Sequence, residues 1–105
     1  MPYYCMALNV AKTSFIWDTG KETLNKRRHG LDFKEASEVF LDPNRVIAVD
    51  EAHSQTEERF FCIGKVGKRV ATVRFTYRGG KIRIIGAGFW RKGRKFYEES
   101  TKKTS

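Results

Sequence analysis

The chain has 105 residues, of which 40% are hydrophobic and 31% charged, and its formal net charge is +9. This length allows one domain with a single modest core, and no apolar run approaches the roughly 20 residues that cross a bilayer. The N-terminus lacks the basic region and cleavage site of a signal peptide, so we expect a cytoplasmic protein in which Cys5 and Cys62 are reduced.

The positive charge is concentrated in one segment of the chain. Residues 1–58 hold seven basic and ten acidic residues, whereas residues 59–97 hold twelve basic residues and no acid. A folded protein with such a segment builds a local field that attracts polyanions. Composition alone therefore favours nucleic acid as the partner, ahead of an anionic membrane surface.

The N-terminal half begins with an extension over residues 1–14 and a short strand-like run over residues 15–17. Thr19 and Glu22 then have the spacing of a capping box, and Gly30 is a typical helix stop. These signals predict a helix from Thr19 to about Arg28.

A second capping box, formed by Asp32 and Glu35, predicts another helix directly afterwards. Apolar residues recur along it at spacings of three, four and seven, and Asp42-Pro43 ends it. The short connection between the two helices predicts a helical hairpin. The apolar stripe consists of Phe33, Ala36, Val39 and Phe40.

The remainder is patterned as strands. Residues 45–49 and 60–66 flank an acidic loop, residues 70–78 alternate between an apolar and a polar face, and residues 81–87 follow a Gly79-Gly80 hairpin signal. We expect a final helix over residues 91–100, weakened by Gly93, and a tail over residues 101–105. The prediction is one α+β domain over residues 15–100: an N-terminal helical hairpin packed on one face of an antiparallel sheet of about four strands, with a short C-terminal helix.

The alternation of the long strand decides where its charges point. Arg74, Thr76 and Arg78 share one face, and Lys81 and Arg83 share one face of the next strand. If these faces coincide, the crowded cations favour a phosphate ligand or an acidic partner, because the segment contains no acid to pair with them. The alternative is a solvated face whose charges discourage edge-to-edge pairing of sheets.

Three other residues have two interpretations each. His29 is suited to proton transfer near neutral pH, but a histidine in the last turn of a helix also interacts favourably with the helix dipole. Trp90 and Tyr97 are equally compatible with base stacking and with burial. No spacing of histidine, cysteine or carboxylate residues indicates a metal or another cofactor.

The chain resembles the BrnT family over roughly residues 15–97. The resemblance implies a metal-independent ribonuclease toxin of a type II toxin–antitoxin module, with a RelE-like fold. It also implies an antitoxin of the BrnA type, a ribbon-helix-helix DNA-binding protein that neutralises the toxin and represses the operon. The motifs are Phe15-x-Trp17-Asp18, Lys21, Asn25, His29-Gly30, Phe33-x-x-Ala36, Phe40-x-Asp42-Pro43, Glu58-Arg59, Ile63-Gly64, Thr76-x-Arg78 and Arg83-Ile84-Ile85-x-Ala87.

Two positions depart from the pattern of the family. Its members commonly read Ile-Ser-Ala-Arg at the end of the last strand, where this chain has Ile85-Gly86-Ala87-Gly88. A glutamate-arginine pair expected in the terminal helix reads Gly93-Arg94 here. If the missing arginine stabilises the transition-state phosphate, its absence reduces activity.

We therefore expect an endoribonuclease toxin that inhibits translation by cutting RNA and contacts operator DNA only through its antitoxin. The expected catalytic residues are Arg59, Arg78 and Arg83, which stabilise the phosphorane, and His29, or alternatively Glu58 or Tyr77, which transfers protons. The expected RNA-binding residues are Lys65, Lys68, Arg69, Arg74, Lys81 and Tyr77. Two alternatives stay open: a degenerate toxin that only binds RNA or antitoxin, favoured by Gly86, Gly88 and Gly93, and a DNA-binding regulator.

Overall fold

A computed structural model of the chain describes residues 14–53 and 56–104. Residues 1–13 of the expected N-terminal extension, including Cys5, lie outside these ranges. None of the described helices is both long enough and apolar enough to cross a bilayer. The elements are β1 (Phe15–Ile16), α1 (Thr19–His29), α2 (Phe33–Ala36), the 3-10 helix η2 (Ser37–Leu41), β2 (Val46–Val49), the 3-10 helix η3 (Glu51–His53), β3 (Phe60–Val66), β4 (Arg69–Arg78), β5 (Lys81–Gly88) and α3 (Arg91–Thr104).

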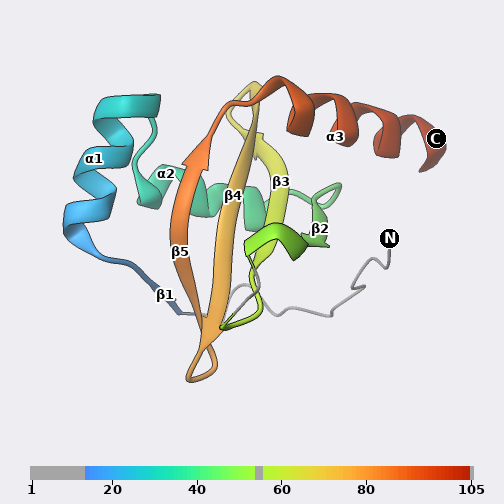
Figure 1. Cartoon of the computed structure of the whole chain (residues 1–105). Helices are drawn as coiled ribbons and strands as arrows, with labels where there is room; N and C mark the ends of the chain where they lie inside the picture. Colours follow the sequence, from blue (N-terminus) through green and yellow to red (C-terminus); the bar gives the residue numbers. More distant parts are fainter. Residues whose placement is uncertain (1–13, 54–55, 105) are drawn as a thin grey trace.

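One five-stranded sheet forms the centre of the molecule, with the order β1-β5-β4-β3-β2 (Figure 1). The chain from β2 to β5 is the predicted antiparallel meander, and the α+β class is confirmed. The expected number of strands is corrected, because β1 pairs with β5 in parallel and adds a fifth strand at the edge. Local patterning marked this segment as extended but contained no information on its partner.

Helix α1 ends where the sequence predicts, at Gly30, whose φ of 70° lies in the left-handed region that glycine accepts readily. Its N-cap is Asp18 rather than Thr19, and the Asp18 carboxylate accepts from the Lys21 amide at 2.9 Å. Glu22 consequently does not close a capping box. Its carboxylate accepts from the Phe33 amide at 3.1 Å and joins α1 to the start of α2.

The second helix begins at the predicted capping box, in which both the Asp32 and the Glu35 side chains accept a backbone N–H. After one α-helical turn it tightens into η2, and the chain leaves it at Asp42. The whole predicted apolar stripe is buried, so the periodicity of the sequence identified the face that meets the sheet.

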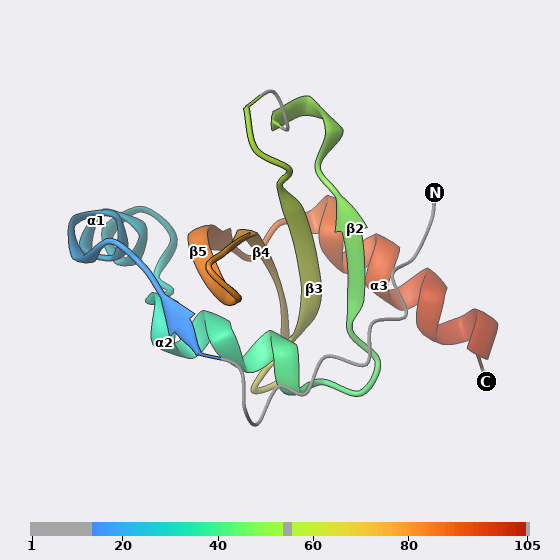
Figure 2. The same cartoon turned by 90° about the horizontal axis from the view of Figure 1, so that it is seen from below.

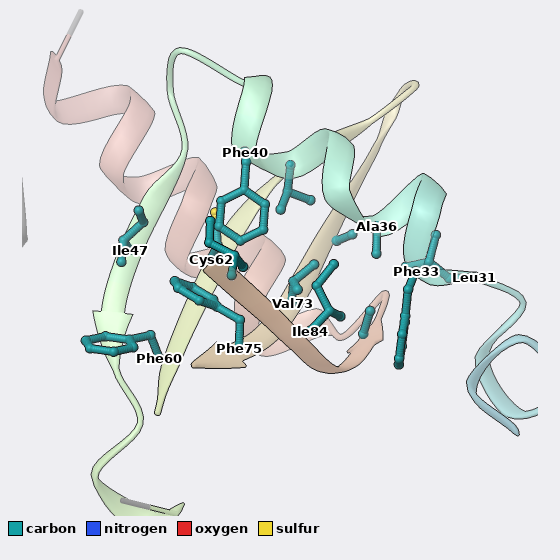
Figure 3. Packing of buried hydrophobic residues seen from close by; sticks show 14 residues of the cluster. Leu31, Phe33, Ala36, Phe40, Ile47, Phe60, Cys62, Val73, Phe75 and Ile84 are labelled. Carbon is teal, nitrogen blue, oxygen red and sulfur yellow. The ribbon is translucent and has the colours of Figure 1, made fainter. Parts of the chain in front are cut away.

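The main core lies between α2, η2 and the inner face of the sheet (Figure 3). Phe40 meets Phe75 edge to face, with ring centroids 5.0 Å apart, and Phe75 stacks on Phe60 at 5.5 Å. Figure 3 shows Val73, Cys62 and Ile84 in the same layer. This interdigitation fixes β4 and β5, which carry most of the expected site residues.

Helix α3, the predicted C-terminal helix, packs on the face of the sheet opposite the one that α2 and η2 cover (Figure 2). Tyr97 completes a second, smaller core with Val46, Ile63 and Val70, all on the outer face of the strands. The helix continues to Thr104, so residues 101–104 are helical rather than a tail. Helix α3 therefore covers the part of the outer face that Val46, Ile63 and Val70 form.

Gly93 is the contact point of α3 on the sheet. A Cβ atom added there would collide with the Thr72 hydroxyl of β4. The sequence suggested that this glycine weakens the helix, but in the fold it lets the helix axis approach the strand closely. The close packing of α3 on β4 therefore requires a glycine at position 93.

Candidate functional site

The register of β4 and β5 brings the expected cations together on the outer face. Thr76 lies opposite Arg83, and Arg78 lies opposite Lys81 across the hairpin. Both hairpin glycines have positive φ, 60° at Gly79 and 76° at Gly80, as the sequence predicts for this turn. The two polar strand faces do coincide.

The acidic loop before β3 supplies counterions to these arginines. The Glu57 carboxylate lies 3.2 Å from the Arg78 guanidinium and 3.7 Å from that of Arg59. Asp50, which is only 3% exposed, lies 3.2 Å from Nε of Arg74. The expectation that only an external phosphate or partner relieves the charge crowding is therefore wrong, because acids distant in sequence fold back over the sheet.

The loop is fastened to the sheet by backbone contacts. The Thr76 hydroxyl donates to the Glu58 carbonyl oxygen at 2.7 Å, and the Asp50 amide donates to the Arg59 carbonyl oxygen at 2.8 Å. Arg83 is half-buried and forms no ion pair within residues 14–53 and 56–104. We call Arg59, Arg78, Arg83 and Glu57 the arginine cluster.

His29 does not lie in the arginine cluster. It is the last residue of α1, and its ring meets Trp90 edge to face at 5.2 Å, beyond the far end of β5. Arg83 and Gly88 are five strand residues apart, which corresponds to roughly 16 Å. Direct proton transfer requires hydrogen-bond distance, so His29 and Arg83 cannot serve one phosphate in this structure. The position of His29 in a basic last turn fits the helix-dipole interpretation.

Tyr77 lies on the inner face, away from the arginine cluster. Its ring packs edge to face against Phe60 and Phe75, with centroids 5.4 Å and 5.5 Å apart. Burial raises the pKa of the Tyr77 phenol above its usual value. Glu58, the other alternative for proton transfer, has an exposed side chain beside the cluster.

The remaining expected RNA-binding residues lie at the opposite end of the sheet. Lys65, Lys68 and Arg69 surround the β3–β4 turn and line a groove of about 930 Å³ beside α3. Trp90 lines the same groove and is 45% exposed, whereas Tyr97 is 4% exposed. The structure thus separates most of the expected site residues into two groups, and it leaves Trp90 exposed while it buries Tyr97.

Gly86 and Gly88, two of the three glycines that depart from the family pattern, have different surroundings. A Cβ atom at Gly86 would meet nothing within 4 Å. A Cβ atom at Gly88 would lie 2.8 Å from the indole of Trp90, which covers this end of the strand. Trp90 therefore occupies the space that a larger residue at position 88 needs.

Glu57 and Asp50 are the polar residues that sequence reasoning missed. The signal for them is the acidic loop next to Arg59, but its local sequence does not show that the loop folds back onto the sheet. Within the described part of the chain, no group of three His, Cys, Asp or Glu side chains is placed to hold a metal ion. Cys62 is free and buried, and burial raises the pKa of its thiol.

Comparison with known proteins is consistent with the resemblance noted in the sequence. A comparison with curated proteins gave no significant match. The family model described as "Ribonuclease toxin, BrnT, of type II toxin-antitoxin system" matches residues 17–93. This range includes the arginine cluster and the basic residues around the β3–β4 turn, whereas α3 after Gly93 lies outside it. The chain therefore belongs to the BrnT family of ribonuclease toxins of type II toxin–antitoxin systems.

Proposed function

We propose that this protein is a metal-independent endoribonuclease and that the arginine cluster is where it cuts RNA. The observation that carries the proposal is the Glu57 carboxylate, which lies 3.2 Å from Arg78 and 3.7 Å from Arg59 on the outer face of the sheet. Cleavage of a phosphodiester by its own ribose needs a proton acceptor and cations held in place, and the cluster combines them.

In the proposed reaction the ribose 2′-oxygen forms a bond to the adjacent phosphorus, while the bond from phosphorus to the 5′-oxygen breaks. Glu57 takes the proton of the 2′-hydroxyl, and the departing 5′-oxygen takes a proton from water. The products are a 2′,3′-cyclic phosphate and a 5′-hydroxyl. Glu57 replaces His29 as the proton acceptor, because His29 lies at the other end of the sheet.

The arginines stabilise the charge that develops on the phosphorane. Arg59, Arg78 and Arg83 come from the loop, β4 and β5, and the sheet register holds the last two on one face. Cations fixed before the reaction need no reorganisation as the charge develops, and this is usually the largest single contribution to such catalysis.

Membership in a type II family implies an antitoxin. We expect a BrnA-like ribbon-helix-helix partner that covers the arginine cluster with an acidic segment and alone contacts operator DNA. Free toxin then inhibits translation by cutting RNA in the cytoplasm. Charge complementarity supports this arrangement, because an acidic segment competes with Glu57 for the same guanidinium groups.

A second candidate is a non-catalytic member of the family that binds RNA or antitoxin. Two observations favour it. Asp50 and Glu57 already neutralise Arg74 and Arg78, which reduces the field available to a phosphate. Trp90 over Gly88 also leaves no room for the arginine that relatives commonly carry there.

The test is RNA cleavage by the purified protein in EDTA. We expect cleavage products that end in a cyclic phosphate, a loss of about 100-fold or more in Arg78→Ala/Arg83→Ala, and a loss of about 100-fold or more in Glu57→Gln. Lys21→Ala/Lys34→Ala removes the same charge from two exposed sites on the helices and is the matched control.

Three outcomes decide between the candidates. Cleavage by the folded double-arginine variant at the parent rate would remove the proposed mechanism. Cleavage that stops in EDTA would contradict metal independence. RNA binding by the parent protein without cleavage would establish the second candidate.

A further inference from the structure

The groove between α3 and the β3–β4 turn is a strongly basic concave surface. Its volume is about 930 Å³, and its lining joins the start of β4 to one side of α3. A single acid, Glu98, lines it. The lining cations are Lys65, Lys68, Arg69, Arg91, Arg94 and Lys102.

The charges of this groove differ from those of the arginine cluster in one respect. Within residues 14–53 and 56–104, no ion pair joins Lys65, Lys68, Arg69, Arg91 or Arg94 to an acid. Arg78 and Arg59, in contrast, share Glu57. The groove therefore keeps its positive field for an external anion, and a row of phosphates matches several separated cations better than one small ion does.

Aromatic rings accompany these cations. The Arg69 guanidinium lies over the Phe89 ring, 3.7 Å from its centroid, and Trp90 next to it is 45% exposed. The indole edge rests against His29 and over Gly88, so the ring is supported rather than free to rotate. An exposed and supported indole beside cations is the usual arrangement for stacking an unpaired base.

The groove is remote from the arginine cluster. Arg69 and Arg78 are the first and last residues of β4, so their backbone positions are roughly 30 Å apart. The long axis of the molecule measures 39 Å, and Figure 1 places the two strand turns at opposite ends of the sheet. A ligand that fills the groove therefore does not reach the proposed cleavage centre unless it is an extended chain.

We propose that this groove binds the backbone of single-stranded RNA, with one base stacked on Trp90, as a docking site separate from the cleavage centre. The inference rests on the proposed function, since it takes RNA as the ligand. An acidic protein segment would also match the cations, but its binding does not require an exposed indole. The aromatic platform thus favours a nucleic-acid strand over a peptide.

The test measures binding without cleavage. The full chain is titrated against a fluorescein-labelled, single-stranded RNA whose riboses carry 2′-O-methyl groups, so the nucleophile for cleavage is absent. We expect Arg91→Gln/Arg94→Gln to bind at least tenfold more weakly and to lower the slope of log affinity against log salt by about 1.4, or 0.7 for each lost phosphate contact. Trp90→Leu is expected to bind roughly tenfold more weakly with an unchanged slope.

The matched control is Lys92→Gln/Lys95→Gln. Both lysines are exposed on the same helix and outside the groove, so this variant removes the same charge with the same effect on the net field. It should bind within about threefold of the parent, because counterion release depends on phosphates contacted and not on total charge. Equal losses in the two double variants would overturn the proposal.

Two further results separate this proposal from the proposed function. Tighter binding of poly-glutamate than of RNA, lost in the groove variant, would assign the groove to an acidic protein and overturn RNA docking. Groove-dependent binding of the methylated RNA together with no cleavage of unmodified RNA would support the docking site while removing the nuclease mechanism.

Discussion

The phenol of Tyr97 donates a hydrogen bond of 2.6 Å to Oδ2 of Asp42, a residue 55 positions earlier in the chain. The same side chain accepts from the amides of Asn44 and Lys65 at 2.8 Å and 2.9 Å. Burial raises the pKa of Asp42, but these hydrogen bonds and the Lys65 charge outweigh it and hold the pKa below its usual value. One carboxylate thus ties α3 to β3 and to the end of η2.

Tyr97→Phe should reduce the free energy of unfolding by about 2 kcal/mol. The substitution keeps the ring in the outer core and removes only a hydrogen bond to a charged acceptor, which contributes about 1.5–3 kcal/mol. Tyr77→Phe is the control, because that phenol forms no hydrogen bond within the described part of the chain, and it should change the value by under about 0.5 kcal/mol. Urea unfolding measures both, and equal effects would contradict the role of Asp42.

The contribution of Tyr97 should disappear at alkaline pH. Burial and then the hydrogen bond to Asp42 raise the pKa of Tyr97 from 10.0 to about 12 in the folded protein. A raised folded-state pKa gives stability that is complete below about pH 10 and is lost as pH rises to about 12. The difference in unfolding free energy between the parent and Tyr97→Phe should therefore shrink across this window. A difference that stays constant from neutral pH to about pH 12 would refute the raised pKa.

Gly93→Ala should destabilise the protein although alanine is the better helix former. The gain in helix propensity is about 1 kcal/mol, but the collision of the new Cβ with the Thr72 hydroxyl forces α3 away from β4 at a cost of about 1–3 kcal/mol. Gly86→Ala, where a Cβ meets nothing within 4 Å, is the matched control and should be near neutral.

A second substitution should rescue Gly93→Ala. The Thr72 hydroxyl is buried and has no hydrogen-bond partner among residues 14–53 and 56–104, so Thr72→Ala removes the colliding atom at little cost. In that background Gly93→Ala should be neutral or stabilising. A double-mutant cycle measured by chemical unfolding checks this coupling, and additive effects would show that the two residues do not collide.

Arg74 and Arg78 share a strand face but should respond differently to substitution by methionine. Arg74 pairs with a carboxylate that is 3% exposed, and its loss leaves Asp50 with an uncompensated charge, at a cost of about 2 kcal/mol or more. Arg78 is half exposed and pairs with a partly exposed glutamate, so its loss should cost under about 1 kcal/mol. Cleavage should show the reverse order, because only Arg78 belongs to the arginine cluster. Equal losses of stability would contradict the structural role of Arg74.

Asn25→Ala should cost about 3 kcal/mol of unfolding free energy. The buried amide donates to the Leu31 carbonyl oxygen at 2.8 Å and accepts from the Ala87 amide at 3.2 Å, which fastens α1 to β5. Truncation leaves both backbone groups buried without partners, at about 1–3 kcal/mol each. Thr23→Ala, on the exposed side of the same helix, should cost under about 0.5 kcal/mol. Thermal or urea unfolding of both variants measures the difference.

Much of the fold followed from local patterns in the chain. The capping box of Asp32 and Glu35, the stop at Gly30 and the Gly79-Gly80 hairpin each act over a few residues, and the structure contains all three. The N-cap lies one residue before the predicted one because Asp18 and Thr19 are both good caps, and in the fold the Asp18 carboxylate accepts from Lys21 while Glu22 bonds to Phe33.

The candidate site was less predictable, because it depends on contacts between distant segments. Alternation placed Arg78 and Arg83 on polar strand faces, and the hairpin made these faces coincide. Nothing in the local sequence indicated that Glu57 folds back onto them. The separation of His29 from the arginines also depends on the packing of α1 beside the far end of β5.

By itself the sequence determined the α+β class, the buried stripe of the second helix and the concentration of positive charge in residues 59–97. The period of apolar side chains and the net charge are properties of the chain before it folds, so they do not depend on the tertiary structure. Only the tertiary structure decided which arginines meet acids and which stay unpaired. The energy of an ion pair weakens as the charges separate by a few ångströms. Residues remote in sequence come this close only after the sheet register and the helix packing are set.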